Sequence, residues 1–377
     1  MGSADETAAQ APLRILVITT GLKLGGAEQQ IAALARAFLA LGNEVAILSL
    51  TQGQEIDLPA KIHVTELAMR KTPLSILAAL RHARGLVQQW RPDVIHAHMV
   101  HANLFARVLA RTGRMPPVIC SAHSAREGGR LRALAYRITD RWCAMTTHVS
   151  NAGRVAMVAS GAVPEGRVIV MPNGIDTSRF RPDPASREQT RRDLGLGPDD
   201  RLVLNVGRLV PEKDQAMLIE AFSVVSHGMP RARLMIAGDG PLRDTLAQEV
   251  ARHGLNHVVL LAGARKDIPE LLRAADVFVL SSRIEGMPLA VGEALASGLP
   301  VVATAAAGVS ELAGDTATLT PTGNPQALAS ALRDAIASLP GTESERDRRR
   351  QRIVGRFDVN GVARQWLAQY RRLRKLP

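Results

Sequence analysis

Short apolar runs alternate with amphipathic segments along almost the whole chain, and this alternation limits the possible folds more than any other feature. Residues 13–19 are apolar and rich in β-branched side chains, which predicts a buried strand. Residues 28–41 carry apolar side chains at helical spacing, and Gly42 and Asn43 end that helix. Repeated strand–helix units of this kind build parallel sheets that helices cover on both faces.

The units form two series. A chain of 377 residues is longer than one compact domain usually is, so two series predict two sheets. In the first half, strands are expected at residues 13–19, 45–50, 94–97, 118–121, 146–149 and 168–171. In the second half, strands are expected at residues 202–206, 234–237, 258–261, 277–280 and 301–303, with helices at 215–223, 242–253, 268–274 and 289–297. We therefore predict an α/β protein with two doubly wound, Rossmann-like domains that face a cleft.

The boundary between the two domains is expected within residues 176–200, where prolines, glycines and charges are typical of a linker. We assign residues 12–180 to the first domain and residues 198–355 to the second. Near the C-terminus, a charged helix at residues 345–352 and a turn at 358–360 precede an amphipathic helix that contains Trp366. Because that helix needs a core to cover, we assign residues 358–377 to the first domain.

The sequence lacks the features of an exported or membrane-spanning protein. Residues 1–11 are small and polar, without the apolar stretch of a signal peptide. No apolar run is long enough to cross a bilayer. The chain has only two cysteines, Cys120 and Cys143, which fits a reducing compartment. We expect a cytoplasmic location.

The strongest candidate for a ligand site is SSRIEGMPLAVGEALAS at residues 281–297. It follows a predicted strand, and Pro288 stands where the first turn of a helix should begin. The backbone N–H groups of Gly286, Met287 and Leu289 then have no partner within the helix, and the helix dipole is positive at that end. These features predict an anion site suited to a diphosphate.

Two glutamates flank this anion site. Glu285 lies in the turn ahead of the helix. Glu293 lies one turn inside it, where a carboxylate can accept hydrogen bonds from two ribose hydroxyls. On their own, the two glutamates are better explained as a loop charge and a solvated helix residue.

Two cations follow another strand of the same predicted sheet. Residues 202–206 lead into GRLVPEKD, which contains Arg208 and Lys213. Cations at this position can bind a pyrophosphate leaving group and stabilise the charge that develops as a glycosidic bond breaks. A third strand end, AGDGP at residues 237–241, contains Gly240, where the backbone can approach a ligand. Ligands of open parallel sheets bind at the carboxyl ends of the strands, so these groups are expected to form one site.

The first half offers fewer candidate groups. GLKLGGAE at residues 21–28 is not a dinucleotide-binding G-x-G-x-x-G, but Gly25 and Gly26 bring backbone to the strand end and open a helix. His123 follows another strand and can hydrogen-bond a sugar hydroxyl or an acceptor. A third group, His96, His98 and His101, has no accompanying cysteine or carboxylate set, so we predict no metal site there.

Together these segments resemble the large family of retaining GT-B glycosyltransferases that includes bacterial lipopolysaccharide, capsule and mannosyl transferases. The resemblance covers nearly everything from Leu13 to Tyr370. The matching segments are GGAE at 25–28, His123 after its strand, SNAGR at 150–154, PNGID at 172–176, VGRLVPEKD at 206–214, GDGP at 238–241, EGMPLAVGE at 285–293 and GVSEL at 308–312.

The resemblance implies roles for single residues. His123 and Glu285 would be the catalytic residues, both close to the transferred sugar. Arg208 and Lys213 would bind the donor phosphates, and Glu293 would hold the ribose. PNGID would stabilise the connection between the domains. The full set implied to bind the donor is Gly25, Gly26, Arg208, Lys213, Gly240, Gly286, Met287, Pro288, Leu289 and Glu293.

The activity implied is metal-independent transfer of a sugar, with retention of configuration, from a nucleotide-diphosphate sugar to a glycan or lipid-linked acceptor in cell-surface polysaccharide synthesis. A UDP- or GDP-sugar is the expected donor, and no further cofactor is implied. An alternative enzyme is a GT-B sugar-nucleotide epimerase, which would need more acid–base groups around the sugar. Another alternative is a non-catalytic protein whose basic surface binds membrane or nucleic acid.

The net charge of +12 is concentrated in the first half. From Arg70 to Cys143, thirteen Lys and Arg residues stand against three acidic ones. Few aromatic side chains accompany them, which argues against nucleic acid as a partner. Arg126, Arg130, Arg132, Arg137 and Arg141 instead alternate with Leu131, Leu134, Ala135 and Ile138. This pattern predicts a basic amphipathic helix that attaches the first domain to the cytoplasmic face of the inner membrane.

Overall fold

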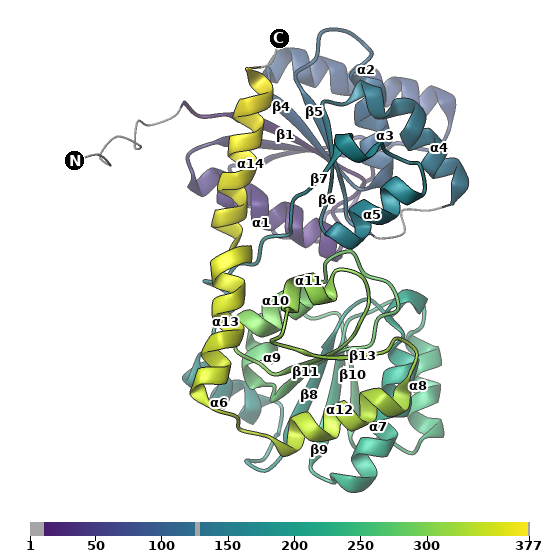
Figure 1. Ribbon diagram of the computed structural model, residues 1–377. Helices are drawn as coiled ribbons and strands as arrows, with labels where there is room; N and C mark the ends of the chain where they lie inside the picture. The colour runs from purple at the N-terminus through teal and green to yellow at the C-terminus, as the bar shows by residue number, and fades with distance from the viewer. Residues whose placement is uncertain (1–10, 125–128, 376–377) are drawn as a thin grey trace, which may run out of the picture.

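The computed structural model describes residues 11–124 and 129–375, which form two α/β domains stacked end to end (Figure 1). Each domain contains one sheet, and every strand pair within it is parallel. The predicted fold class is therefore confirmed. Arg126, Glu127 and most of the polar N-terminal segment lie outside the described residues.

The first sheet has seven strands in the order β3-β2-β1-β4-β5-β6-β7. Its strands are β1 Arg14–Thr19, β2 Glu44–Ser49, β3 His63–Glu66, β4 Val94–His98, β5 Val118–Ala122, β6 Met145–His148 and β7 Val168–Val170. Its helices are α1 Gly26–Ala40, α2 Pro73–Trp90, α3 Val100–Leu109, α4 Arg130–Thr139 and α5 Asn151–Ala159. The strand order reverses between β1 and β4, and the crevice above such a reversal is where open sheets bind ligands.

The second sheet has six strands in the order β10-β9-β8-β11-β12-β13. Its strands are β8 Arg201–Val206, β9 Ala232–Ala237, β10 Val259–Gly263, β11 Val277–Leu280, β12 Val301–Thr304 and β13 Thr318–Thr320. Its helices are α7 Gln215–Gly228, α8 Arg243–Arg252, α9 Ile268–Ala274, α10 Leu289–Ala296, α11 Val309–Ala313 and α12 Pro325–Ala337. The order reverses between β8 and β11. The predicted site segment with Arg208 and Lys213 follows β8, and the one with Glu285 follows β11.

The segment expected to be a linker contains a helix, α6 Pro184–Asp193. It is fixed to the second domain by ion pairs, since Arg187 and Arg191 both contact the carboxylate of Asp276 just ahead of β11. Arg191 also donates to the backbone oxygen of Ala274. This part of the expected boundary segment therefore packs on the second domain.

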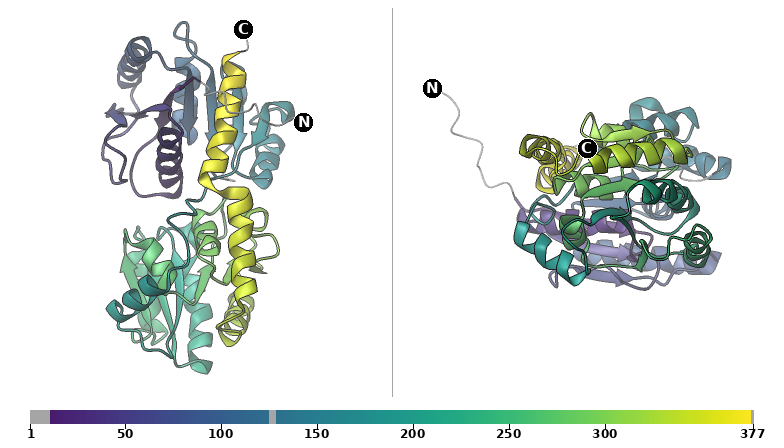
Figure 2. Two further views of the ribbon diagram at one scale, coloured as in Figure 1. Left: turned by 90° about the vertical axis from the view of Figure 1, so that its left-hand side faces the viewer. Right: turned by 90° about the horizontal axis from the view of Figure 1, so that it is seen from below.

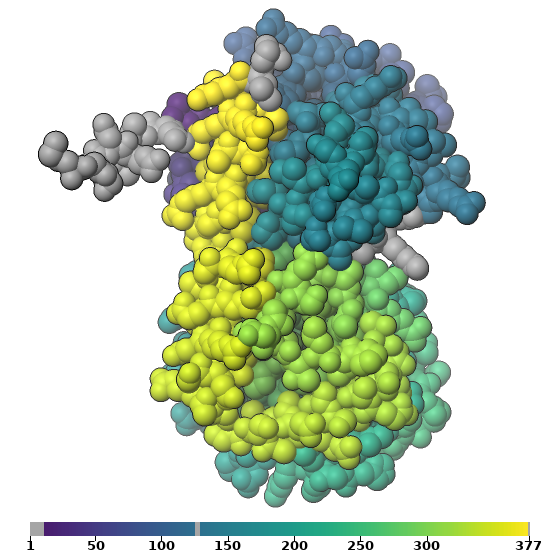
Figure 3. Space-filling model, viewed as in Figure 1, coloured from purple at the N-terminus to yellow at the C-terminus, as the bar shows by residue number. Residues whose placement is uncertain are grey.

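The chain returns to the first domain through two consecutive helices, α13 Glu343–Phe357 and α14 Val359–Arg374. Only Asp358 separates them, so the turn predicted at 358–360 is reduced to one residue. In Figures 1 and 2, α13 runs along the second domain and α14 along the first. Figure 3 shows the two helices as one yellow strip over both domains. Trp366 and Tyr370 of α14 are buried in the core that also contains Phe38 of α1.

The two connections between the domains lie next to each other. The backbone N–H of Ile175 donates to the oxygen of Phe357 at 2.7 Å, and the N–H of Val359 donates to the oxygen of Ile175 at 2.9 Å. The hydroxyl of Thr177 donates to the carboxylate of Asp358. The outgoing and returning chain segments thus form a paired hinge.

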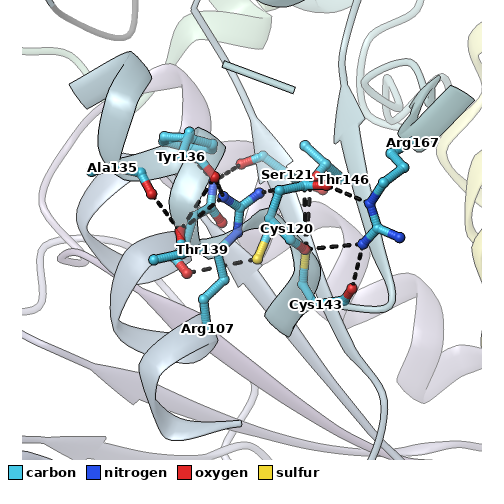
Figure 4. A network of polar contacts seen from close by, with 11 residues as sticks. Arg107, Cys120, Ser121, Ala135, Tyr136, Thr139, Cys143, Thr146 and Arg167 are labelled. Carbon is cyan, nitrogen blue, oxygen red and sulfur yellow. Dashed lines mark hydrogen bonds and ion pairs between the residues drawn. The ribbon is translucent and has the colours of Figure 1, made fainter. Parts of the chain in front are cut away.

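A buried polar network joins α3, α4 and β6 (Figure 4). The guanidinium of Arg107 is completely buried, lies over the ring of Tyr136 and donates to Thr146 Oγ1 at 2.7 Å. Asp140 pairs with Arg107 at 3.3 Å and also with Arg167. The network ties β6 to the helices beside it and so supports the strand ends that reach the candidate site.

Among the described residues, no helix combines the length and apolar character that crossing a membrane requires.

Candidate active site

Lys213 and Glu285 are brought together from different strand ends of the second sheet. Lys213 lies in a short 3-10 turn after β8, and Glu285 follows β11. The Nζ of Lys213 donates to Glu285 Oε1 at 2.6 Å. Ser281 holds the same turn by donating from its hydroxyl to the backbone oxygen of Lys213 at 2.8 Å. The side chain of Glu285 is 8% exposed and that of Lys213 is 24% exposed, so the pair is mostly shielded from water.

The loop of Gly286 and Met287 is held between the two domains. A Cβ on Gly286 would lie 2.0 Å from the backbone oxygen of His123, so only glycine allows this approach. Asn173 donates from its side chain to the oxygen of Met287 at 3.1 Å, and its backbone N–H donates to the sulfur. The PNGID segment therefore contacts the segment predicted to bind the donor. Pro288 is the N-cap of α10, one position ahead of the predicted start, and Leu289 is the first helical residue.

Glu293 lies in α10 and is partly buried. Burial raises the pKa of its carboxyl to about 7, against the opposing effect of the positive charge on Arg179. Glu293 can therefore change charge in the physiological range.

The glycine pair at 25–26 opens α1, which begins at Gly26 with Gly25 as its N-cap. The carboxylate of Glu28 lies so close to Gly25 that a Cβ there would be 2.3 Å from Oε2. Burial raises the pKa of Glu28, while its own backbone N–H and the positive charge of Arg208 act in the other direction. Arg208 is exposed and belongs to the second domain, so its charge acts across the space between the domains.

Gly240 has a packing reason for being glycine. A Cβ there would lie 2.5 Å from the backbone oxygen of Leu209, so the turn after β9 packs directly on the loop after β8. This contact is within the protein, and a role of Gly240 toward the donor stays a prediction.

His123 follows β5 and lies beside the Gly286 loop of the other domain. Its Nε2 is 2.9 Å from Nδ1 of His98. Burial, and to a lesser degree the neighbouring His148, lowers the pKa of His123 to about 3. The ring is therefore neutral near pH 7, as a hydrogen-bonding partner for a sugar hydroxyl would be.

Two contacts at the site were not predicted from sequence. Glu311 of α11 accepts hydrogen bonds from the backbone N–H groups of Asn151 and Ala152, at 2.6 and 2.8 Å, at the N-terminus of α5. His98 contacts His123. The GVSEL and SNAGR segments and the spacing of His96 and His98 mark these residues in the sequence. None of these patterns predicts that Glu311 contacts α5 or that His98 contacts His123.

Among the described residues, no group of three or more His, Cys, Asp or Glu side chains has the arrangement of a metal site. His96 and His98, two of the clustered histidines, hydrogen-bond Tyr370, Ser121 and His123 instead.

Two parallel, doubly wound sheets in two domains that meet at one junction are the architecture of the GT-B fold. Residues 186–352 match the family described as glycosyl transferases group 1, and residues 24–179 match the one described as glycosyltransferase family 4. The chain belongs to these glycosyltransferases, as the sequence motifs predicted.

Curated relatives carry related names. The putative glycosyltransferase EpsF of Bacillus subtilis is 28% identical over 307 residues, 77% of this chain and 78% of that protein. The UDP-Gal:alpha-D-GlcNAc-diphosphoundecaprenol alpha-1,3-galactosyltransferase of Escherichia coli is 31% identical over 227 residues, 58% of this chain and 59% of that protein. A GDP-mannose-dependent alpha-(1-6)-phosphatidylinositol monomannoside mannosyltransferase of Mycolicibacterium smegmatis is 33% identical over 243 residues, 61% and 63% of the two chains.

Solved structures share the fold. Anabaena Alr3699/HepE in complex with UDP-glucose superposes with a TM-score of 0.83 at 24% identity, over 96% of this chain and 100% of that one. WaaG, a glycosyltransferase involved in lipopolysaccharide biosynthesis, superposes with a TM-score of 0.75 at 19% identity, over 95% and 99% of the two chains.

Proposed function

We propose that the protein transfers a hexosyl group from a UDP- or GDP-sugar to a glycan or lipid-linked acceptor, with retention of configuration. The observation that carries the proposal is the Lys213–Glu285 pair at 2.6 Å, beside the N-terminus of α10 and the loop that meets His123. The named activities of two relatives, on UDP-galactose and GDP-mannose, support this class of donor.

The arrangement suits a donor whose diphosphate lies against Lys213 and Arg208. The diphosphate would compete with Glu285 for Lys213 and so release that carboxylate to contact the sugar. As the glycosidic bond breaks, Lys213 and Arg208 stabilise the charge on the leaving phosphate. Glu293 would accept hydrogen bonds from the ribose.

For the chemical step we propose front-face substitution through an oxocarbenium-like state, in which the leaving phosphate takes the proton of the acceptor hydroxyl. Retention through a covalent intermediate would instead need Glu285 as a nucleophile. A trapped glycosyl–Glu285 intermediate would disprove the front-face route.

The test of donor use is a thermal-shift screen against UDP-, GDP-, ADP- and dTDP-sugars, followed by a hydrolysis assay with the donor that binds. Replacement of Lys213 by Ala should reduce turnover by about 100- to 1000-fold, because one preorganised charge at a reacting centre is worth that much. Arg252→Ala, on the exposed face of α8, is the matched control and should leave turnover unchanged. Unaltered donor binding and turnover in Lys213→Ala would exclude the proposed site.

We further propose that the first domain attaches to the cytoplasmic face of an anionic membrane through α4. Leu131, Leu134 and Ile138 of this helix are 83%, 51% and 53% exposed, although they are apolar. Arg130 and Arg137 on the same helix are exposed as well. Apolar side chains framed by arginines are typical of helices that lie in a membrane interface.

The membrane proposal is tested by binding to vesicles that contain anionic phospholipid. The double variant Arg130→Glu, Arg137→Glu should bind at least about 30-fold more weakly, since each basic residue near such a surface contributes about 1 kcal/mol. Arg231→Glu with Arg333→Glu, on exposed positions of the second domain, is the control of equal charge. Equal loss in both double variants would point to net charge alone and contradict a docking helix.

A further inference from the structure

A chain of hydrogen-bonded side chains begins at the C-terminal helix and ends in the first sheet. The hydroxyl of Tyr370 is 2.6 Å from Nδ1 of His96. Nε2 of His96 is 2.7 Å from the hydroxyl of Ser121, which is in turn 2.7 Å from that of Thr147. Both ring nitrogens of His96 are therefore engaged, and its ring has one fixed orientation.

His98 lies two residues further along β4, on the same face of the sheet. Its ring lies against that of His96, with 3.9 Å between the ring centroids. The indole of Trp366 lies on His96 as well, at 4.3 Å. His98 is 2% exposed and so has little freedom to turn. Its Nδ1 is the atom that meets Nε2 of His123.

The two histidines that meet are both neutral. Burial lowers the pKa of His123 to about 3 and the pKa of His98 well below its usual range. A neutral imidazole has one N–H, so in this contact one nitrogen donates and the other accepts. The donor of this bond decides which tautomer each ring has, and hence whether the second nitrogen of His123 donates or accepts.

We propose that His98 is a positioning residue for sugar transfer: its Nδ1 fixes the plane and the tautomer of His123, while His96, Tyr370 and Trp366 hold His98 in place. The inference rests on the proposed function in one respect, that His123 contacts the transferred sugar. The proposal also gives α14 a function in the first domain, because Trp366 and Tyr370 of α14 pack against His96 in the row of His96, His98 and His123.

Two amide substitutions separate positioning from simple packing. In His98→Asn the amide stands near the place of Nδ1, and in His98→Gln it stands near the place of Nε2. Both variants keep a polar side-chain amide at this position, so both are expected to fold. If His98 acts through Nδ1, Asn restores the contact to His123 and Gln does not.

We expect His98→Gln to lower turnover of the donor by about 100-fold, the usual effect of a small misplacement at a reacting centre, with donor affinity within about threefold of wild type. His98→Asn should recover most of that turnover. His101→Gln is the control, since His101 is a partly exposed neighbour on α3 that lies outside the row of His96, His98 and His123. Equal turnover in His98→Asn and His98→Gln would overturn the proposal.

A second measurement does not depend on activity. In the full-length protein labelled with ¹⁵N-histidine, the ring nitrogens of His123 should shift in His98→Gln and keep wild-type positions in His98→Asn. Unshifted His123 resonances in His98→Gln would overturn the proposal even if turnover fell. If the wild-type protein uses none of the four donor classes, the proposed function fails, and the spectra still decide whether His98 sets the tautomer of His123.

Discussion

Glu293 can switch its charge near neutral pH, because burial raises the pKa of its carboxyl to about 7. The folded pKa lies above the ordinary value of 4.5, so the folded protein binds this proton more tightly than the unfolded chain does. The stability that this proton contributes is lost as the pH rises through 7. A ribose whose hydroxyls donate to the carboxylate would favour the ionised form instead.

Donor affinity should therefore rise with pH. About a tenth of Glu293 is ionised at pH 6 and about nine tenths at pH 8, so the donor Kd should fall by about tenfold over that range. Isothermal titration calorimetry at both pH values measures the change. The variant Glu293→Gln should bind the donor with a nearly constant Kd. The same pH dependence in that variant would show that another group is responsible.

Gly26 gives a test of where the diphosphate lies. No atom lies within 4 Å of the place where its Cβ would stand, so Gly26→Ala disturbs no protein contact. Its effect on stability should be neutral or favourable by up to about 1 kcal/mol, as for glycine to alanine in a helix. If the diphosphate approaches Gly26, the methyl group should weaken donor binding about tenfold or more, whereas Gly85→Ala in α2 should not. Wild-type affinity in Gly26→Ala would place the diphosphate elsewhere.

At the scale of secondary-structure elements, the polar network in Figure 4 adds to the apolar contacts that join α3 to the first sheet. Arg107 is 0% exposed and its partner Asp140 is 4% exposed. Removal of one member of such a buried pair leaves the other charge without compensation.

Asp140→Ala should therefore destabilise the first domain by about 3–5 kcal/mol, measured as the midpoint of its unfolding transition in urea. Asp315→Ala provides the contrast, because the Arg348–Asp315 pair is 62% and 73% exposed. That exposed pair should contribute at most about 1 kcal/mol. Similar losses in the two variants would mean that burial does not set the strength of these pairs.

Three of the elements that were not expected from the sequence, β3, β13 and α6, lack an apolar run of their own. β3 and β13 are short edge strands of four and three residues, without the apolar run of the central strands. α6 has almost no apolar side chains, and its position depends on Asp276, more than eighty residues further along the chain. Local patterns predict elements that bury their own apolar face. They do not predict elements that distant ion pairs hold.

The candidate site likewise contains residues that local sequence patterns predict and contacts that they do not. Lys213 and Glu285 could be predicted, because each follows an apolar strand and strand ends of one sheet meet at one edge. The contact of Glu311 with α5 could not, since it joins different domains across about 160 residues of sequence. His98 could be predicted only as part of a histidine cluster, because its orientation depends on His123 and on the ring of His96, which Ser121 and Trp366 contact.

At the scale of the whole molecule, contacts on both sides of the hinge hold the domains in this arrangement. Asn173 binds Met287, the backbone of His123 touches Gly286, and Glu311 accepts two hydrogen bonds at the N-terminus of α5. A carboxylate there also benefits from the positive end of the helix dipole.

Glu311→Gln keeps the size of this side chain and removes its charge. The domain arrangement described here should become less populated, and turnover per molecule of bound donor should fall by roughly fivefold, since a charged hydrogen bond contributes about 1 kcal/mol more than a neutral one. Single-molecule distance measurements between one label on each domain would report the population directly. Glu343→Gln, at an exposed position of α13, is the control. An unchanged distance distribution in Glu311→Gln would show that this carboxylate does not hold the domains together.

The pairing of Ile175 with Phe357 and Val359 also affects how such a protein can diversify. Since the second domain enters and leaves at neighbouring points, it is topologically an insertion into the first. A homologous domain could be grafted at those two points without altering the rest of the host. If nucleotide-sugar preference lies in the insertion and acceptor preference in the host, recombination at this junction can combine the two specificities independently.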